Sequence, residues 1–186
     1  MTKKQFWQAA SNWGFMGGAA LFVMNLVAWA LRLEDGNSWA YELLQFLVIC
    51  PLIIVTGRRN ARLAGAEGYS YGRAVGFVFA MMMFAGIVYG VGRFLLMNFI
   101  APEYYDALNA KSFEAALAMY ANLPQYDTIL EQTNSMLRLL TNPVVLIFQG
   151  VFELVIKGGF LGLVLCAFFT RKPDIFAETG DENRNE

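Results

Sequence analysis

The sequence predicts an all-α integral membrane protein with four transmembrane helices and a short two-helix extracytoplasmic cap. The first reason is composition: the 186 residues are 57% hydrophobic and only 16% charged, whereas a soluble domain has about a quarter charged residues. The second reason is a set of four long apolar runs, since about 20 such residues cross a bilayer. Because the runs are continuous, without the alternation of barrel strands, we expect helices.

The apolar runs divide the chain into spans, connections and a tail. The spans cover about residues 13–31, 39–56, 75–100 and 143–170, and the outer segment covers 101–142. Residues 1–172 are therefore expected to form a single membrane domain, followed by a polar, disordered cytoplasmic tail at 173–186. Ala28-Trp29-Ala30 has the form of a signal-peptide cleavage site. The first run is nevertheless longer than the about 7–15 residues of a signal core, so we expect no cleavage.

Lysine and arginine are distributed unevenly on the two sides of these spans. Because cytoplasmic loops are enriched in both residues, the richer side is expected to be cytoplasmic, with both termini inside. The richer side holds nine, which are Lys3, Lys4, Arg58, Arg59, Arg62, Arg73, Arg171, Lys172 and Arg184. The other side holds three, which are Arg32, Lys111 and Arg138.

The connection at residues 57–74 is the most basic one, with Arg58, Arg59, Arg62 and Arg73. The simpler interpretation is that these residues only reflect the positive-inside bias. The alternative is that they contact anionic lipid head groups.

The outer segment is expected to form two short helices. The first has apolar residues at helical spacing and would be capped by Ser112 and ended by Pro124. The second covers about residues 128–140, and Asn142 followed by Pro143 predicts the start of the fourth span. The apolar residues of the first helix are Phe113, Ala116, Leu117 and Tyr120. Such faces usually cover the ends of the spans, and a dedicated binding site is the alternative.

Several ionisable residues fall inside the predicted spans, where charged groups are costly and are candidates for function. Gln149, Glu153 and Lys157 have spacings of four, so they share one helix face, on which Glu153 and Lys157 can pair. Arg93 lies about 10 Å from the outer end of the third span, close to the level of Glu153. Glu42, on the second span, is the other carboxylate available to Arg93.

This intramembrane group has two interpretations. The simpler one is a buried ionic clamp that fixes which helices face each other, because such charges usually pair and face inward. The alternative is a site for an ion, a proton or a lipid head group. Asn25 and Gln45 are single polar residues in the spans, and we expect inter-helical hydrogen bonds from them.

Small residues with GxxxG spacing predict close helix packing in the membrane. From their depth, Gly86 and Gly90 on the third span are expected to meet Gly158 and Gly162 on the fourth, with the closest approach near Gly86 and Gly158. The alternative is that these glycines form a homodimer face. The same spacing occurs at Gly14/Gly18 and at Gly68/Gly72/Gly76.

Composition also excludes whole classes of function. With no histidine, the chain lacks His-based catalytic triads and His-ligated zinc sites, and no catalytic residue, metal site or cofactor is expected. Cys50 and Cys166 both lie in apolar runs, so a disulfide scaffold is not expected. The net charge of −1 gives no field that would attract nucleic acid.

Three segments carry a family resemblance: 67–77 (EGYSYGRAVGF), 101–106 (APEYYD) and 159–172 (GFLGLVLCAFFTRK). Together they resemble the domain-of-unknown-function family 4199, small four-span inner-membrane proteins of the Bacteroidetes. The resemblance extends over about residues 6–172 and implies a bacterial inner-membrane location without catalytic residues. It also implies an association with membrane glycosyltransferases, since such proteins are often encoded beside one.

From these observations we expect a non-enzymatic accessory or scaffold subunit for another envelope protein. Its expected partners are the lipid bilayer and an integral membrane protein, for which a membrane glycosyltransferase is one candidate. The alternative is a small transporter or channel that uses Arg93, Glu153 and Lys157. Transport requires a water-accessible path to Glu153, whereas a scaffold keeps the charged group dry and paired.

The nine-to-three distribution of basic residues predicts the topology. Single cysteines at Gly36, Lys111 and Ala61, in a background without Cys50 and Cys166, would be treated with a membrane-impermeant thiol reagent. Cells with a permeabilised outer membrane should be labelled at 36 and 111 only. Labelling at 61 with an intact inner membrane would contradict this topology.

Overall fold

The computed structural model describes residues 2–33, 38–65, 68–120 and 142–170, and its elements are helices. Four are long and apolar enough to cross a membrane: α1, α2, α3 together with η3, and α6. The predicted all-α membrane fold with four spanning helices is confirmed. The elements are α1 (Lys3–Ala30), α2 (Ser38–Ala64), α3 (Tyr71–Leu95), the π-helical turn η3 (Leu96–Ile100), α4 (Pro102–Tyr120) and α6 (Pro143–Cys166).

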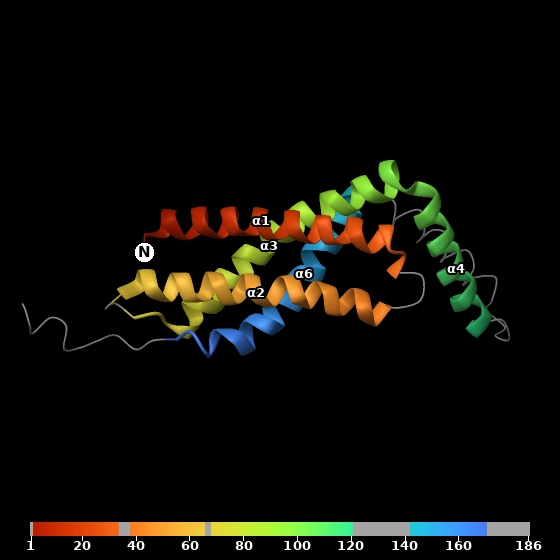
Figure 1. Cartoon of the computed structure of the whole chain (residues 1–186). Helices are drawn as coiled ribbons and strands as arrows, with labels where there is room; N and C mark the ends of the chain where they lie inside the picture. Colours follow the sequence, from red (N-terminus) through yellow and green to blue (C-terminus); the bar gives the residue numbers. More distant parts are fainter. Residues whose placement is uncertain (1, 34–37, 66–67, 121–141, 171–186) are drawn as a thin grey trace, which may run out of the picture.

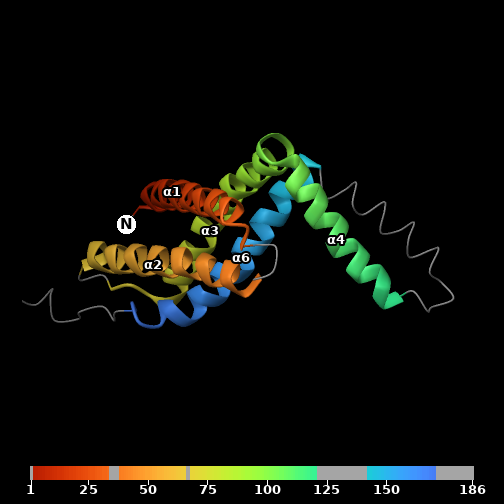
Figure 2. The ribbon, with the colours of Figure 1, turned by 45° about the vertical axis from the view of Figure 1, so that its right-hand side comes forward.

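Consecutive spanning helices run in opposite directions along the bundle (Figure 1). The starts of α1 and α3 and the ends of α2 and α6 lie at one end of the bundle, which we call the basic end. The most buried of the four is α3, which packs along α6 and α1, while α2 contacts the same two helices. The bundle is therefore built around α3, and α4 leaves its opposite end at an angle (Figure 2).

Glycines set the distance between α3 and α6. A Cβ atom added to Gly86 would lie 2.4 Å from Cα of Val151, and one added to Gly90 would lie 2.6 Å from Cα of Ile147. On the facing helix, a Cβ on Gly150 would lie 2.8 Å from Cα of Gly90. The two backbones are thus in direct contact, which only glycine allows at this spacing.

The expected contact between Gly86 and Gly158 is wrong. Gly158 instead faces the Met82 side chain, and Gly162 faces Val78, both nearer the basic end than Gly86. The register is set by Gly150, which has no GxxxG partner and was therefore overlooked. Counting residues from the span ends gave the depth of each glycine but not the face it occupies.

The GxxxG pair of α1 also packs against α3. Added Cβ atoms at Gly14 and Gly18 would each lie 2.6 Å from a carbonyl oxygen, that of Met81 and Ala85 respectively. The central helix therefore has close backbone contacts on two sides.

The basic connection is shorter than predicted, because α2 continues to Ala64. Arg58, Arg59 and Arg62 consequently lie on the last helical turns, since Arg, Ala and Leu favour helix and nothing breaks it earlier. The helix ends before Gly65, whose φ of +54° is a left-handed conformation typical of a residue after a helix. Ala61 is 5% exposed, so the exposed Arg62 is the better position for a labelling cysteine.

At the other end, α4 begins at Pro102, so the expected cap at Ser112 is wrong and this residue lies inside the helix. Tyr105 belongs to a small apolar cluster with Leu96, and Trp29 of α1 packs against this cluster, which thereby attaches the start of α4 to the bundle. The predicted cap by Asn142 is confirmed, because its Oδ1 accepts a hydrogen bond from the Val144 amide at 2.9 Å. Pro124, the expected second outer helix at 128–140 and the tail at 173–186 lie outside the described residues.

Gly→Ala substitutions at two positions of α3 should distinguish the effect of helix packing on stability from the effect of helix propensity. Gly86→Ala should lower the free energy of unfolding by about 1–3 kcal/mol, because the methyl group collides with the backbone of α6. Gly76→Ala is the matched control, since nothing lies within 4 Å of its Cβ position. Thermal unfolding in detergent, with oligomer size measured in parallel, checks this. A change in oligomer size at unchanged stability would instead place Gly86 at a subunit interface.

Candidate functional site

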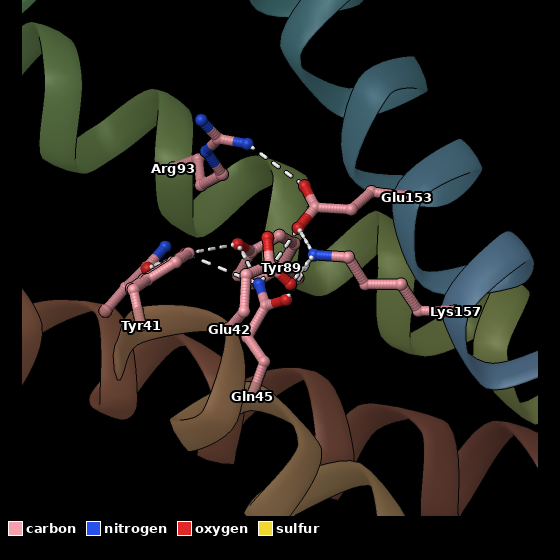
Figure 3. Close-up of polar contacts among 8 residues, drawn as sticks. Tyr41, Glu42, Gln45, Tyr89, Arg93, Glu153 and Lys157 are labelled. Atoms are coloured by element: carbon pink, nitrogen blue, oxygen red, sulfur yellow. Dashed lines mark hydrogen bonds and ion pairs between the residues drawn. The ribbon is translucent and has the colours of Figure 1, made fainter. Parts of the chain in front are cut away.

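Ionisable side chains from three helices converge inside the bundle, between α2, α3 and α6 (Figure 3). We call this group the ionic cluster: Glu42 from α2, Arg93 from α3, and Glu153 and Lys157 from α6. All four were singled out from the sequence. The fold brings them together because Glu153 and Lys157 occupy one face of α6, and this face lies opposite Arg93 and α2.

Glu153 lies at the centre of the ionic cluster. Its Oε2 accepts a hydrogen bond from Arg93 Nη1 at 3.2 Å. Its Oε1 accepts two more, each at 2.9 Å, from Lys157 Nζ and Gln45 Nε2. One carboxylate is thus held by donors from three helices, and such charge-assisted bonds are about twice as strong as neutral ones.

Lys157 is held equally well. Its ammonium group lies 2.9 Å from Glu153 Oε1 and 2.6 Å from Glu42 Oε2, and it donates to Gln45 Oε1 at 2.6 Å. An ammonium group has three donors, and here each has an acceptor. Glu42, which the sequence offered as a carboxylate for Arg93, forms its ion pair with Lys157.

Two tyrosines connect this network to α1. The Tyr41 hydroxyl lies 2.8 Å from the Tyr89 hydroxyl and donates to Asn25 Oδ1 on α1. Gln45 Nε2 donates to Tyr89 at 2.9 Å and joins this pair to Glu153. The expected inter-helical hydrogen bonds of Asn25 and Gln45 are therefore confirmed, and the polar network includes all four spanning helices.

Tyr41 and Tyr89 are the members that sequence reasoning missed. Each lies one helical turn before a residue that was identified, Gln45 and Arg93 respectively. The Arg93 guanidinium carbon also lies 5.9 Å from the centre of the Tyr89 ring. A search for polar residues four positions from Gln45 and from Arg93 would have found both.

The ionic cluster borders a groove on the side of the bundle. The groove has a volume of about 460 Å³ and is lined by α2, α3 and α6, with Gln149 and Phe152 on its α6 wall. The side chains of Arg93, Glu153 and Lys157 are 19–23% exposed, and that of Glu42 is 45% exposed. Gln149 shares the face of Glu153, as expected, but is exposed to the groove.

The formal charges of the ionic cluster cancel, because two cations face two carboxylates. Each charged group has an oppositely charged partner within 3.2 Å. No group of three or more potential metal ligands occurs in the described part of the chain. Chemically, this arrangement is suited to holding helices together.

The chain belongs to the family described as "Protein of unknown function (DUF4199)", whose sequence profile matches residues 12–171. The resemblance found in the sequence is thereby confirmed. Neither a curated protein nor a solved structure matches the chain.

The paired charges predict a non-additive mutational effect. Glu153→Gln and Lys157→Met should each lower the free energy of unfolding, because the remaining partner becomes an uncompensated charge. The loss is about 3–5 kcal/mol for a fully buried pair. It should be smaller here, because both side chains are about a fifth exposed. The double variant restores neutrality and should unfold closer to wild type than either single variant. Thermal unfolding in detergent measures this. Glu103→Gln, on exposed α4, is the control, and additive losses would show that the two residues do not interact.

Proposed function

We propose that this four-span protein is a non-enzymatic accessory or scaffold subunit for another envelope protein in the bacterial inner membrane. The observation that supports the proposal best is the neutral, mutually paired state of the ionic cluster. A site that moves ions or protons needs a charged group able to exchange its partner. Here the partners are exchanged only at the cost of leaving a charge unpaired in a poorly solvated place.

A partner in the membrane would find a formed surface beside the groove. Along α6, four large apolar side chains recur at a spacing of four and are 56–71% exposed: Phe148, Phe152, Ile156 and Phe160. On α2, Trp39, Leu43 and Leu47 are 54–69% exposed. Aromatic residues are enriched at protein interfaces. Phe152 and Ile156 also line the polar groove, which can add hydrogen bonds to the packing.

A membrane glycosyltransferase is our candidate for the partner, with the chain oriented so that both termini lie in the cytoplasm. The basic end of the bundle then faces the cytoplasm, in agreement with the positive-inside rule. The exposed apolar face of α6 would hold the partner at a fixed depth. This role needs no catalytic residue in the chain itself.

A small transporter or channel is the second candidate, and the groove beside the ionic cluster is the observation that favours it. Transport would require water to reach Glu153 through the groove and leave on the other side of the membrane. A scaffold requires only that lipid or a partner cover the groove.

Site-specific photo-cross-linking tests the scaffold proposal in cells. A photoreactive amino acid at Phe152 should give a discrete adduct with one integral membrane protein, identified by mass spectrometry. The matched control is Phe15 on α1, which is similarly exposed, at 63% against 71% for Phe152. Adducts with lipid alone at both positions, or the same adducts at both, would contradict a dedicated partner surface.

A further inference from the structure

A second groove lies between α1 and α2 at the basic end, apart from the ionic cluster. Its volume is about 750 Å³, and it shares no lining residue with the groove beside Glu153. The α1 wall includes Gln8, Asn12, Trp13 and Met16, and the α2 wall includes Arg59 and Leu63. Most of its surface is apolar, with polar groups from both helices.

Arg59 is the one cationic residue among the lining residues that the structure describes. Its guanidinium carbon lies 5.6 Å from the centre of the Trp13 ring. This cation–π contact holds a planar group that can bind a phosphate with two parallel hydrogen bonds. Within the described residues, Arg59 has no carboxylate partner, so its charge is free for a ligand.

Among the residues that the structure describes, the charged side chains at the basic end are all cationic. Every carboxylate in the described ranges belongs to the ionic cluster or to α4, at or towards the other end of the bundle. The described residues of the basic end carry Lys3, Lys4, Arg58, Arg59, Arg62 and Arg73. Of these six cations, Arg59 is the one that lines the groove, where it lies over the Trp13 ring.

We propose that this groove binds the head group of an anionic glycerophospholipid. Arg59 pairs with the phosphate, and the side-chain amides of Gln8 and Asn12 donate hydrogen bonds to phosphate or ester oxygens. Met16 and the Trp13 ring offer an apolar wall for the start of an acyl chain. A lipid suits the groove better than a soluble anion, because most of the lining is apolar and would gain nothing from a free phosphate.

Two arginines that are adjacent in the sequence allow a matched test. Both arginines are exposed, but only Arg59 lines the groove, and either Arg→Gln change alters the net charge equally. Native mass spectrometry of the purified protein would measure retained phosphatidylglycerol, phosphatidylethanolamine with the same acyl chains, and inorganic phosphate. This groove and the partner surface on α6 are independent, so either can fail alone.

Wild type should retain phosphatidylglycerol in preference to both other probes. Arg59→Gln should weaken this binding by about tenfold, the scale of one lost charge-assisted bond, with Arg58→Gln close to wild type. Gln8→Leu, a change at an exposed position of the groove, is a second test variant. It should also weaken phosphatidylglycerol binding, and it can be measured even if Arg59→Gln folds poorly. Equal losses for Arg58→Gln and Arg59→Gln would show a diffuse positive charge and overturn the site. Equal retention of both lipids, or displacement by inorganic phosphate, would also overturn it.

Discussion

The requirement to satisfy one carboxylate in a poorly solvated place governs the arrangement of this protein. Glu153 accepts three hydrogen bonds, from Arg93, Lys157 and Gln45. The donors come from α2, α3 and α6, so the carboxylate is satisfied only when these helices take their observed positions. Apolar side chains alone would not impose this, because helix surfaces made of Leu or Val pack about as well against lipid as against each other.

The glycines and the ionic cluster depend on each other. The contact of Gly86 and Gly90 with Gly150 brings the backbones of α3 and α6 together one turn before Glu153. At a larger separation, the Arg93 guanidinium would lie beyond the 3.2 Å at which it reaches Glu153. The glycine contacts thus set the separation and register of the two backbones, and the Arg93–Glu153 ion pair stabilises the same register, since a one-residue slip would separate the two charges.

The sequence was sufficient for the properties that depend on composition and spacing. Four apolar runs predicted four spanning helices, and a spacing of four predicted that Glu153 and Lys157 share a face. The partner of Glu42 and the contact of Gly158 could not be obtained in this way, because both depend on the rotation of one helix relative to another. Tyr41 and Tyr89 were missed for a related reason: an amphipathic tyrosine in a span is equally typical of packing, and only the fold brings the two hydroxyls together.

The cancellation of charge in the ionic cluster has an electrical consequence. A single elementary charge moved across the whole bilayer gains about 2.3 kcal/mol for each 100 mV of membrane potential. The two cations and two carboxylates are bonded to one another, so they move as one body whose net charge is zero. A membrane potential across the bundle therefore exerts no net force on the cluster as a whole.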